Sequence, residues 1–94
     1  ADAQLRVCLG KALALGPRVL LAEYPNVALL PDQGQRFAVD LAGIAARRNL
    51  AMVVMTAEQR FASTVSERVL TLTPATGVLT TASGWRSWFT RRAR

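Results

Sequence analysis

The stretch RVLLAEYPNVAL, residues 18–29, decides the fold of this chain. Its short apolar run is bounded by turn-forming residues, which predicts a strand buried on both faces, as in parallel α/β sheets. Glu23 then stands at the carboxyl end of the strand, which is the edge where open α/β sheets place their ligands. The stretch therefore predicts an α/β fold with a ligand-binding edge near Glu23.

The composition bounds the size and class of the protein. The chain has 94 residues, of which 51% are hydrophobic and 19% are charged, and this is typical of one small globular domain. No apolar run approaches the roughly 18 residues that a membrane-spanning helix requires. The first residues also lack the pattern of a secretory signal. We expect a cytoplasmic location, with the inner face of the membrane as an option.

Chemistry that depends on cysteine or histidine is restricted. The chain has one cysteine, Cys8, and no histidine. A lone cysteine forms no intrachain disulfide and fits a reducing compartment, while zinc, copper and haem sites of the usual kinds are excluded. The commonest general base near neutral pH is missing as well.

The last residues, 83–94, form a basic and aromatic tail on an α/β core that spans residues 1–82. Trp85, Trp88 and Phe89 share one face of any helix, because they lie at i, i+3 and i+4. The net charge of +6 favours anionic partners. The tail is a candidate for contact with an anionic membrane or, less favoured, with nucleic acid. The alternative is that its aromatic residues pack on the domain. The predicted contact residues are Trp85, Arg86, Trp88, Arg91 and Arg92.

Apolar periodicity predicts the remaining elements. A helix over residues 1–15 ends at Gly16, and a second helix begins at Pro31 with Asp32 as its N-cap. Residues 50–55 form a second buried strand and residues 59–65 a short helix. Strands 67–72 and 78–81 form a hairpin at the end of the sheet. The apolar face of the second helix comprises Phe37, Val39, Leu41, Ile44 and Ala45.

Several segments resemble the nucleotide-binding domain of ATP-binding-cassette (ABC) ATPases. RVCLGKAL (6–13) is similar to the family's Arg-Val-x-x-Ala-Arg-Ala-Leu helix, and ERVLTL (67–72) to its acidic-Arg-Val-x-x-Leu strand. The family writes its Walker B and D-loop as apolar residues followed by Asp-Glu-Pro-Thr-Ser-Ala-Leu-Asp, where this chain has EYPNVALL (23–30). The resemblance implies the C-terminal half of that domain. This is a partial P-loop NTPase-like three-layer fold with parallel strands, flanking helices and a C-terminal hairpin.

The resemblance also implies that key nucleotide-binding positions are degenerate. Asp2 falls in the signature, where the family's glycines approach phosphate; the alternative is an ordinary chain terminus. Glu23 stands at the metal-holding carboxylate and Tyr24 at the catalytic Glu, although a tyrosine is a poor base at pH 7. A second alignment, with one inserted residue, makes Glu23 the catalytic Glu and puts Ala22 at the metal position. Ala57 replaces the switch His, so this slot is empty.

The resulting functional prediction is an ABC-transporter-like segment without ATP hydrolysis, which acts as a binding or regulatory subunit of a transport complex. The phosphate cradle Gly-x-x-x-x-Gly-Lys-Ser/Thr does not occur, so ATP and magnesium would bind only together with an upstream half. Asp2, Glu23 and Glu58 could meet at one sheet edge and bind a cation, but carboxylates at strand ends are more often helix caps and turn residues.

Partners follow from the incomplete sheet, whose exposed edge invites association. They are a second copy, another subunit, a missing N-terminal half, or a membrane-embedded transporter subunit. Two alternatives for the function are a basic adaptor that binds through its tail and a fragment of an active ABC ATPase. The sequence begins at Ala1 inside a motif, which favours a piece of a longer protein.

Overall fold

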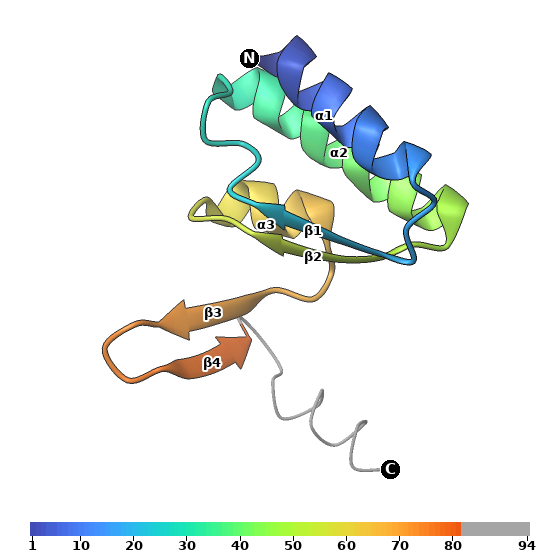
Figure 1. Cartoon of the computed structure of the whole chain (residues 1–94). Helices are drawn as coiled ribbons and strands as arrows, with labels where there is room; N and C mark the ends of the chain where they lie inside the picture. The colour runs from blue at the N-terminus through green and yellow to red at the C-terminus, as the bar shows by residue number, and fades with distance from the viewer. Residues whose placement is uncertain (82–94) are drawn as a thin grey trace.

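A computed structural model describes residues 1–81 of the chain. The tail residues proposed above as membrane contacts therefore lie outside the described residues. Figure 1 shows the order of the elements along the chain. They are α1 (Asp2–Ala14), β1 (Val19–Glu23), α2 (Pro31–Arg48), β2 (Ala51–Met55), α3 (Gln59–Val65), β3 (Leu70–Thr73) and β4 (Val78–Thr81).

The predicted α/β fold class is confirmed. β1 and β2 pair in parallel, from Val19 opposite Ala51 to Glu23 opposite Met55, and α2 connects them. β3 and β4 form the predicted antiparallel hairpin around a turn at residues 74–77. This arrangement is consistent with part of a P-loop NTPase-like domain.

The hairpin differs from the prediction in one respect, because it forms a sheet of its own. Ser66 Oγ donates to the Arg68 carbonyl (3.1 Å) and accepts from the Arg68 N–H (3.0 Å), which fixes a turn directly after α3. β3 consequently begins at Leu70 rather than at residue 67. All four of its residues are exposed, so the hairpin adds little to the core.

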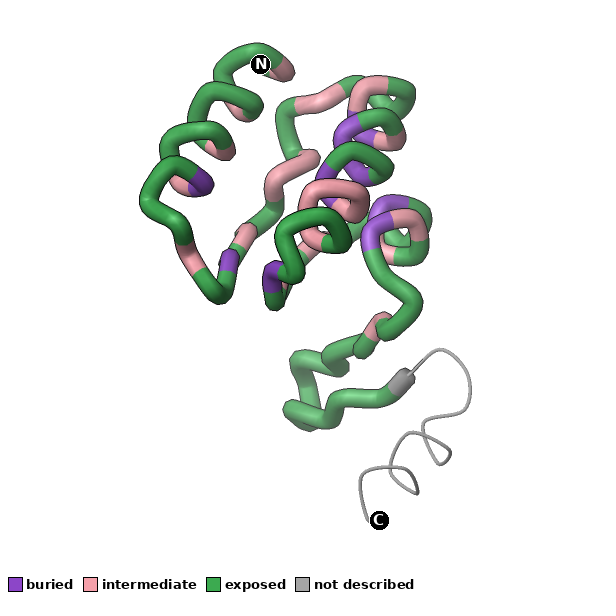
Figure 2. Tube along the Cα trace, turned by 90° about the vertical axis from the view of Figure 1, so that its right-hand side faces the viewer, coloured by how far each residue is buried: buried purple, intermediate pink, exposed green. Residues whose placement is uncertain are grey.

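The core lies where the helices meet one face of the β1–β2 sheet (Figure 2). Phe37 from α2 and Phe61 from α3 are 2% and 0% exposed, and α2 packs directly along α3. The sheet contributes Leu20 from β1 and the half-buried Met52 from β2. The remaining buried members of the cluster are Leu13, Ala38, Leu41, Leu50 and Val65.

The opposite side of the sheet is exposed, so the prediction that both strands are buried on both faces was wrong. Val19 and Leu21 are 56% and 73% exposed, and Val53 and Met55 are 56% and 50% exposed. The reason is that α1 and α2 cover the other face, and no helix within residues 1–81 covers this one (Figure 1). The third layer of the predicted three-layer arrangement is therefore not supplied by the described part. We call this side the open face; its residues are Val19, Leu21, Glu23, Ala51, Val53 and Met55.

The N-terminus of α2 corrects a second prediction. Its N-cap is Leu30 and not Asp32, because proline has a fixed φ and no N–H and therefore suits the first helical position. Gln33 Oε1 accepts a hydrogen bond from the Leu30 N–H (3.0 Å). Asp32 lies in the first turn, where its charge still favours the positive end of the helix dipole.

The buried face of α2 differs from the predicted apolar face at residue 39. Val39 is 60% exposed, whereas Gly34 and Ala38 are buried with Phe37 and Leu41. Residues 34, 37, 38 and 41 follow the helical spacing of three and four, and residue 39 falls off that stripe.

One glycine inside α1 and one just after its end provide a matched test of where the helix stops. Gly16 follows the helix with φ +63°, whereas Gly10 lies inside it, and a Cβ at either position meets no atom within 4 Å. We expect Gly16→Ala to lower the free energy of unfolding by about 1 kcal/mol. Gly10→Ala is expected to raise it by roughly 0.5–1 kcal/mol. Urea denaturation measures both, and equal effects of the two changes would contradict the assigned helix end.

Candidate functional site

The candidate site is the edge formed by the carboxyl ends of β1 and β2. Glu23 is the last residue of β1 and pairs with Met55, the last residue of β2. The Tyr24 N–H donates to the Met55 carbonyl (2.7 Å), which extends the pairing beyond the strand. Ala57 follows two residues after Met55. The structure thus brings the predicted positions Glu23, Tyr24 and Ala57 to neighbouring strand ends.

Tyr24 has a backbone conformation that is uncommon for its residue type. Its φ is +49°, in the left-handed region that side chains other than glycine rarely adopt. The following Pro25 makes this more unusual, because a residue before proline favours extended backbone. The Val27 N–H donates to the Tyr24 carbonyl (3.2 Å) and holds the turn. Strain of this kind costs about 1–3 kcal/mol and concentrates at functional sites.

Asn26 joins the two strand ends through its side-chain amide. Its Nδ2 donates to Glu58 Oε2 (2.9 Å), and its Oδ1 accepts from Thr56 Oγ1 (2.9 Å). Thr56 Oγ1 in turn accepts from the Glu58 backbone N–H (3.2 Å). The sequence prediction missed Asn26. The available signal was an amide in the turn after one strand, facing Thr and Glu after its parallel neighbour.

The two carboxylates of this edge differ in their hydrogen bonding. The Glu58 carboxylate accepts a hydrogen bond from Asn26, whereas the Glu23 carboxylate is exposed and makes no hydrogen bond or ion pair with a side chain in the described range. Residues 1–81 contain no group of three or more acidic or cysteine side chains that could hold a metal ion. Glu23 is therefore the carboxylate of this edge that is open to a ligand.

Replacing Asn26 tests the link between the strand ends. Asn26→Ala removes both side-chain hydrogen bonds, and we expect a loss of about 1–2 kcal/mol in the free energy of unfolding. Asn26→Asp keeps the acceptor for Thr56 but opposes two negative charges, so it should cost more at pH 7 than at acidic pH. Chemical denaturation at both pH values measures this. A loss that is equal at both would contradict the contact with Glu58.

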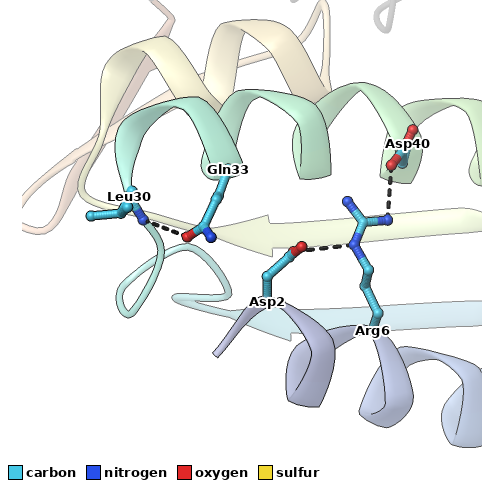
Figure 3. A network of polar contacts seen from close by, with 5 residues as sticks. All are labelled: Asp2, Arg6, Leu30, Gln33 and Asp40. Atoms are coloured by element: carbon cyan, nitrogen blue, oxygen red, sulfur yellow. Dashed lines mark hydrogen bonds and ion pairs between the residues drawn. The ribbon is translucent and has the colours of Figure 1, made fainter.

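Asp2 lies in a separate ion-pair network between α1 and α2 (Figure 3). Arg6 Nε donates to Asp2 Oδ1 (3.1 Å), and an Arg6 terminal nitrogen donates to Asp40 Oδ2 (2.8 Å). The hydrogen bond to Asp40, and next the one to Asp2, raises the pKa of the Arg6 guanidinium above its usual value. The negative charge that Asp2 places at the signature position is thus shared with a cation.

This network borders a shallow hollow of about 560 Å³, lined by Asp2, Arg6, Gln35, Arg36, Val39 and Asp40. Its charged side chains are two acidic and two basic ones. Thr64 Oγ1 donates to Gln35 Oε1 (2.8 Å), which ties α3 to α2 beside the hollow. With two acidic and two basic side chains in its lining, the hollow favours no one class of charged ligand.

Arg6→Met tests the energetic weight of these ion pairs. Both pairs are partly exposed, and exposed pairs contribute only about 0.2–1 kcal/mol each. The guanidinium also lies 5.6 Å from the centre of the Phe37 ring, a contact worth about 0.5–1 kcal/mol. We expect a total loss of about 1 kcal/mol, reduced in high salt.

The matched control for this measurement is Arg48→Met, at the exposed end of α2, which should have almost no effect. Because the Arg6 pKa is raised, its contribution is complete below the unfolded-state pKa and is lost only as the pH rises through the folded-state value. Stability differences between Arg6→Met and the parent that fade between pH 7 and pH 9 would contradict this.

Comparison with known proteins supports the resemblance. The chain is 36% identical over 66 residues to a probable amino-acid ABC transporter ATP-binding protein, y4tH, of Sinorhizobium fredii, covering 70% of this chain and 26% of that protein. It is 34% identical over 67 residues to the glutamate transport ATP-binding protein GluA of Corynebacterium glutamicum (71% and 27%). It is 38% identical over 69 residues to the spermidine/putrescine import ATP-binding protein PotA 1 of Pseudomonas aeruginosa (73% and 19%).

The matches cover only a part of each relative. The chain spans about a quarter of the length of the first two relatives. No family model matches the sequence, and no solved structure matches it. Within the described part, no helix is long and apolar enough to cross a membrane. The matches are consistent with a partial nucleotide-binding domain, as the sequence motifs predicted.

Proposed function

With about 70% of its length similar to ABC transporter ATP-binding proteins, we propose that this partial ABC nucleotide-binding segment binds nucleotide without hydrolysing it. In this proposal it acts as a binding or regulatory component of a transport complex. It works in the cytoplasm, at the inner face of the membrane when its complex is assembled.

One observation carries the proposal, namely the pair of side chains at the two strand ends. ATP hydrolysis requires a carboxylate that holds the metal ion and a group that positions the attacking water. Tyr24 directly follows β1, and Ala57 lies two residues after the end of β2. A tyrosine hydroxyl is a poor base at neutral pH, and an alanine methyl group accepts no hydrogen bond. Neither side chain can therefore position water for attack.

Glu23 keeps a role in the proposal as the candidate ligand of a magnesium-bound water. It is exposed at the end of β1, and carboxylates are the usual protein ligands of magnesium. The second alignment would make Glu23 the catalytic residue and leave Ala22 at the metal position. Both alignments leave one carboxylate where hydrolysis uses two, so both predict impaired turnover.

Nucleotide binding in this proposal depends on sequence beyond the chain. The phosphate cradle does not occur in these residues, so the phosphates would be held by an upstream half or by a facing subunit. Glu23 would then contribute through magnesium. A component that binds ATP but turns over slowly would hold its complex in the ATP-bound state.

The test is an ATP-binding titration on the natural full-length polypeptide, performed with and without magnesium. We expect magnesium-dependent binding that weakens in Glu23→Gln and is unchanged in Asp32→Asn, an exposed carboxylate in the first turn of α2. Equal weakening in both variants would point to a general loss of negative charge. Binding that ignores Glu23→Gln would overturn the metal role assigned to Glu23.

A further inference from the structure

The amino ends of β1 and β2 and the carboxyl ends of α1 and α2 lie at the end of the sheet opposite the candidate site (Figure 1). The Ala51 N–H, at the start of β2, donates to the carbonyl of Arg18, directly before β1 (3.2 Å). Two residues connect Arg48 at the end of α2 to Ala51, and residues 15–18 connect α1 to β1. This end therefore gathers residues from four elements.

Four cationic side chains are exposed at this end of the sheet. Lys11 lies in the last turn of α1, Arg18 directly precedes β1, and Arg47 and Arg48 lie in the last turn of α2. Their side chains make no hydrogen bond or ion pair within residues 1–81. A Cβ at Gly43 would stand 3.0 Å from Arg47 Nη1, so this guanidinium lies back over the preceding turn. The basic surface consequently extends along the end of α2.

An exposed leucine stands among these cations. Leu15 is the C-cap residue of α1 and is 86% exposed, the largest fraction among the exposed large hydrophobic residues of the described part. It lies four residues after Lys11 and three before Arg18. We call this surface the basic end; its residues are Lys11, Leu15, Arg18, Arg47 and Arg48.

The helix dipole explains a part of this charge pattern. Cations favour helix C-termini and anions favour N-termini, and Asp2 and Asp32 do lie in the first turns of α1 and α2. The dipole does not account for Arg18, which precedes a strand, or for the exposure of Leu15. Unpaired cations around an exposed apolar side chain are instead typical of a surface that meets an anionic partner.

We propose that the basic end binds an acidic segment of a partner protein, with an apolar side chain of that segment against Leu15. Three of the four cations are arginines, whose planar guanidinium pairs with a carboxylate through two parallel hydrogen bonds. The charge and its chemistry are therefore complementary to closely spaced aspartate and glutamate side chains.

Two other anionic partners fit this surface less well. A single leucine offers far less apolar area than a myristoyl chain, which by itself gives only marginal membrane binding. Nucleic-acid strands bind through aromatic residues on which bases stack. In the described part, Phe37 and Phe61 are buried in the core, and Tyr24 follows the opposite end of β1.

The basic end is separate from the candidate nucleotide-binding edge. Arg18 precedes β1 and Glu23 ends it, and a strand of five residues spans about 17 Å. A partner bound at the basic end would leave the carboxyl edge of the sheet accessible. The proposal therefore does not depend on nucleotide binding.

Fluorescence anisotropy on the natural full-length polypeptide tests the proposal, with a fluorescein-labelled peptide of repeated Glu-Glu-Leu triplets as the probe. Arg18→Gln with Arg48→Gln should raise the dissociation constant about tenfold, because two charged contacts are lost. Leu15→Ser should raise it several-fold. The matched control, Arg36→Gln with Arg60→Gln, removes the same charge from exposed positions of α2 and α3 and should leave it unchanged. Far-UV circular dichroism verifies that each variant is folded.

Several outcomes would overturn the proposal. If the peptide does not bind, or if both double variants weaken it equally, the basic end is not a specific site for acidic segments. Tighter binding to phosphatidylserine vesicles or to duplex DNA, lost in Arg18→Gln with Arg48→Gln, would assign the surface to a membrane or to nucleic acid. Displacement of the peptide by magnesium-ATP would place the contact at the carboxyl edge instead. Absence of ATP binding would contradict the proposed function alone.

Discussion

Replacing Phe37 by alanine is expected to lower the free energy of unfolding by about 3–5 kcal/mol, because it leaves a ring-sized cavity in the core. Phe37 is 2% exposed and belongs to the cluster that joins the three helices to the sheet. Urea denaturation followed by circular dichroism measures the loss. Val39→Ala is the control on the same helix, with 60% exposure and an expected effect within about 0.5 kcal/mol.

The size of the domain makes this loss decisive. A chain of 94 residues has a total stability on the order of 5–14 kcal/mol, and here one face of its sheet contributes little burial. Phe37→Ala should therefore remove a large share of the total stability and lower the urea midpoint of unfolding clearly. A fully folded variant with an unchanged unfolding midpoint would show that the core does not depend on the contact between α2 and the sheet.

The second large effect is a gain of turnover in the double variant Tyr24→Glu with Ala57→His. These changes supply a carboxylate and an imidazole at the two strand ends, and a positioned acid or base contributes typically 10²–10⁴-fold to a rate. We expect ATP hydrolysis by the natural full-length polypeptide to rise about 10²-fold. Phosphate release at saturating magnesium-ATP measures the rate.

The control for this gain is Tyr24→Gln with Ala57→Asn, which introduces side chains of similar size that neither accept nor donate a proton readily. It should leave the rate at the level of the parent chain. If the double variant binds ATP but gains nothing over this control, then residues other than Tyr24 and Ala57 limit hydrolysis. The role assigned to the two strand ends would then be wrong.

Much of the fold could be predicted from local patterns. The range predicted for α3 is the observed one, and the predicted end of α1 at Gly16 is correct. Both could be predicted because apolar periodicity and helix-ending residues act locally. Burial was harder to predict. The apolar run at residues 19–22 has the composition of a strand buried on both faces, but burial depends on which layers the chain supplies. Here Leu20 is buried and Leu21 is exposed.

In the candidate site, too, local features could be predicted and contacts between distant segments could not. The positions of Glu23 and Ala57 at neighbouring strand ends followed from the strand pattern and the family spacing. The bridge from Asn26 to Glu58 joins residues 32 apart in the chain, so it depends on the register of two strands that local sequence does not specify. The pairing of Arg6 with Asp40 was missed for a related reason, because it requires α1 to lie against α2.

The account rests on the claim that a nucleotide-binding scaffold persists here without its hydrolytic side chains. Single-turnover hydrolysis of magnesium-ATP by the natural full-length polypeptide, with bound nucleotide quantified in the same sample, tests this most directly. The account predicts stoichiometric ATP that remains uncleaved over many minutes. Rapid conversion of the bound ATP to ADP, abolished by Glu23→Gln, would contradict it.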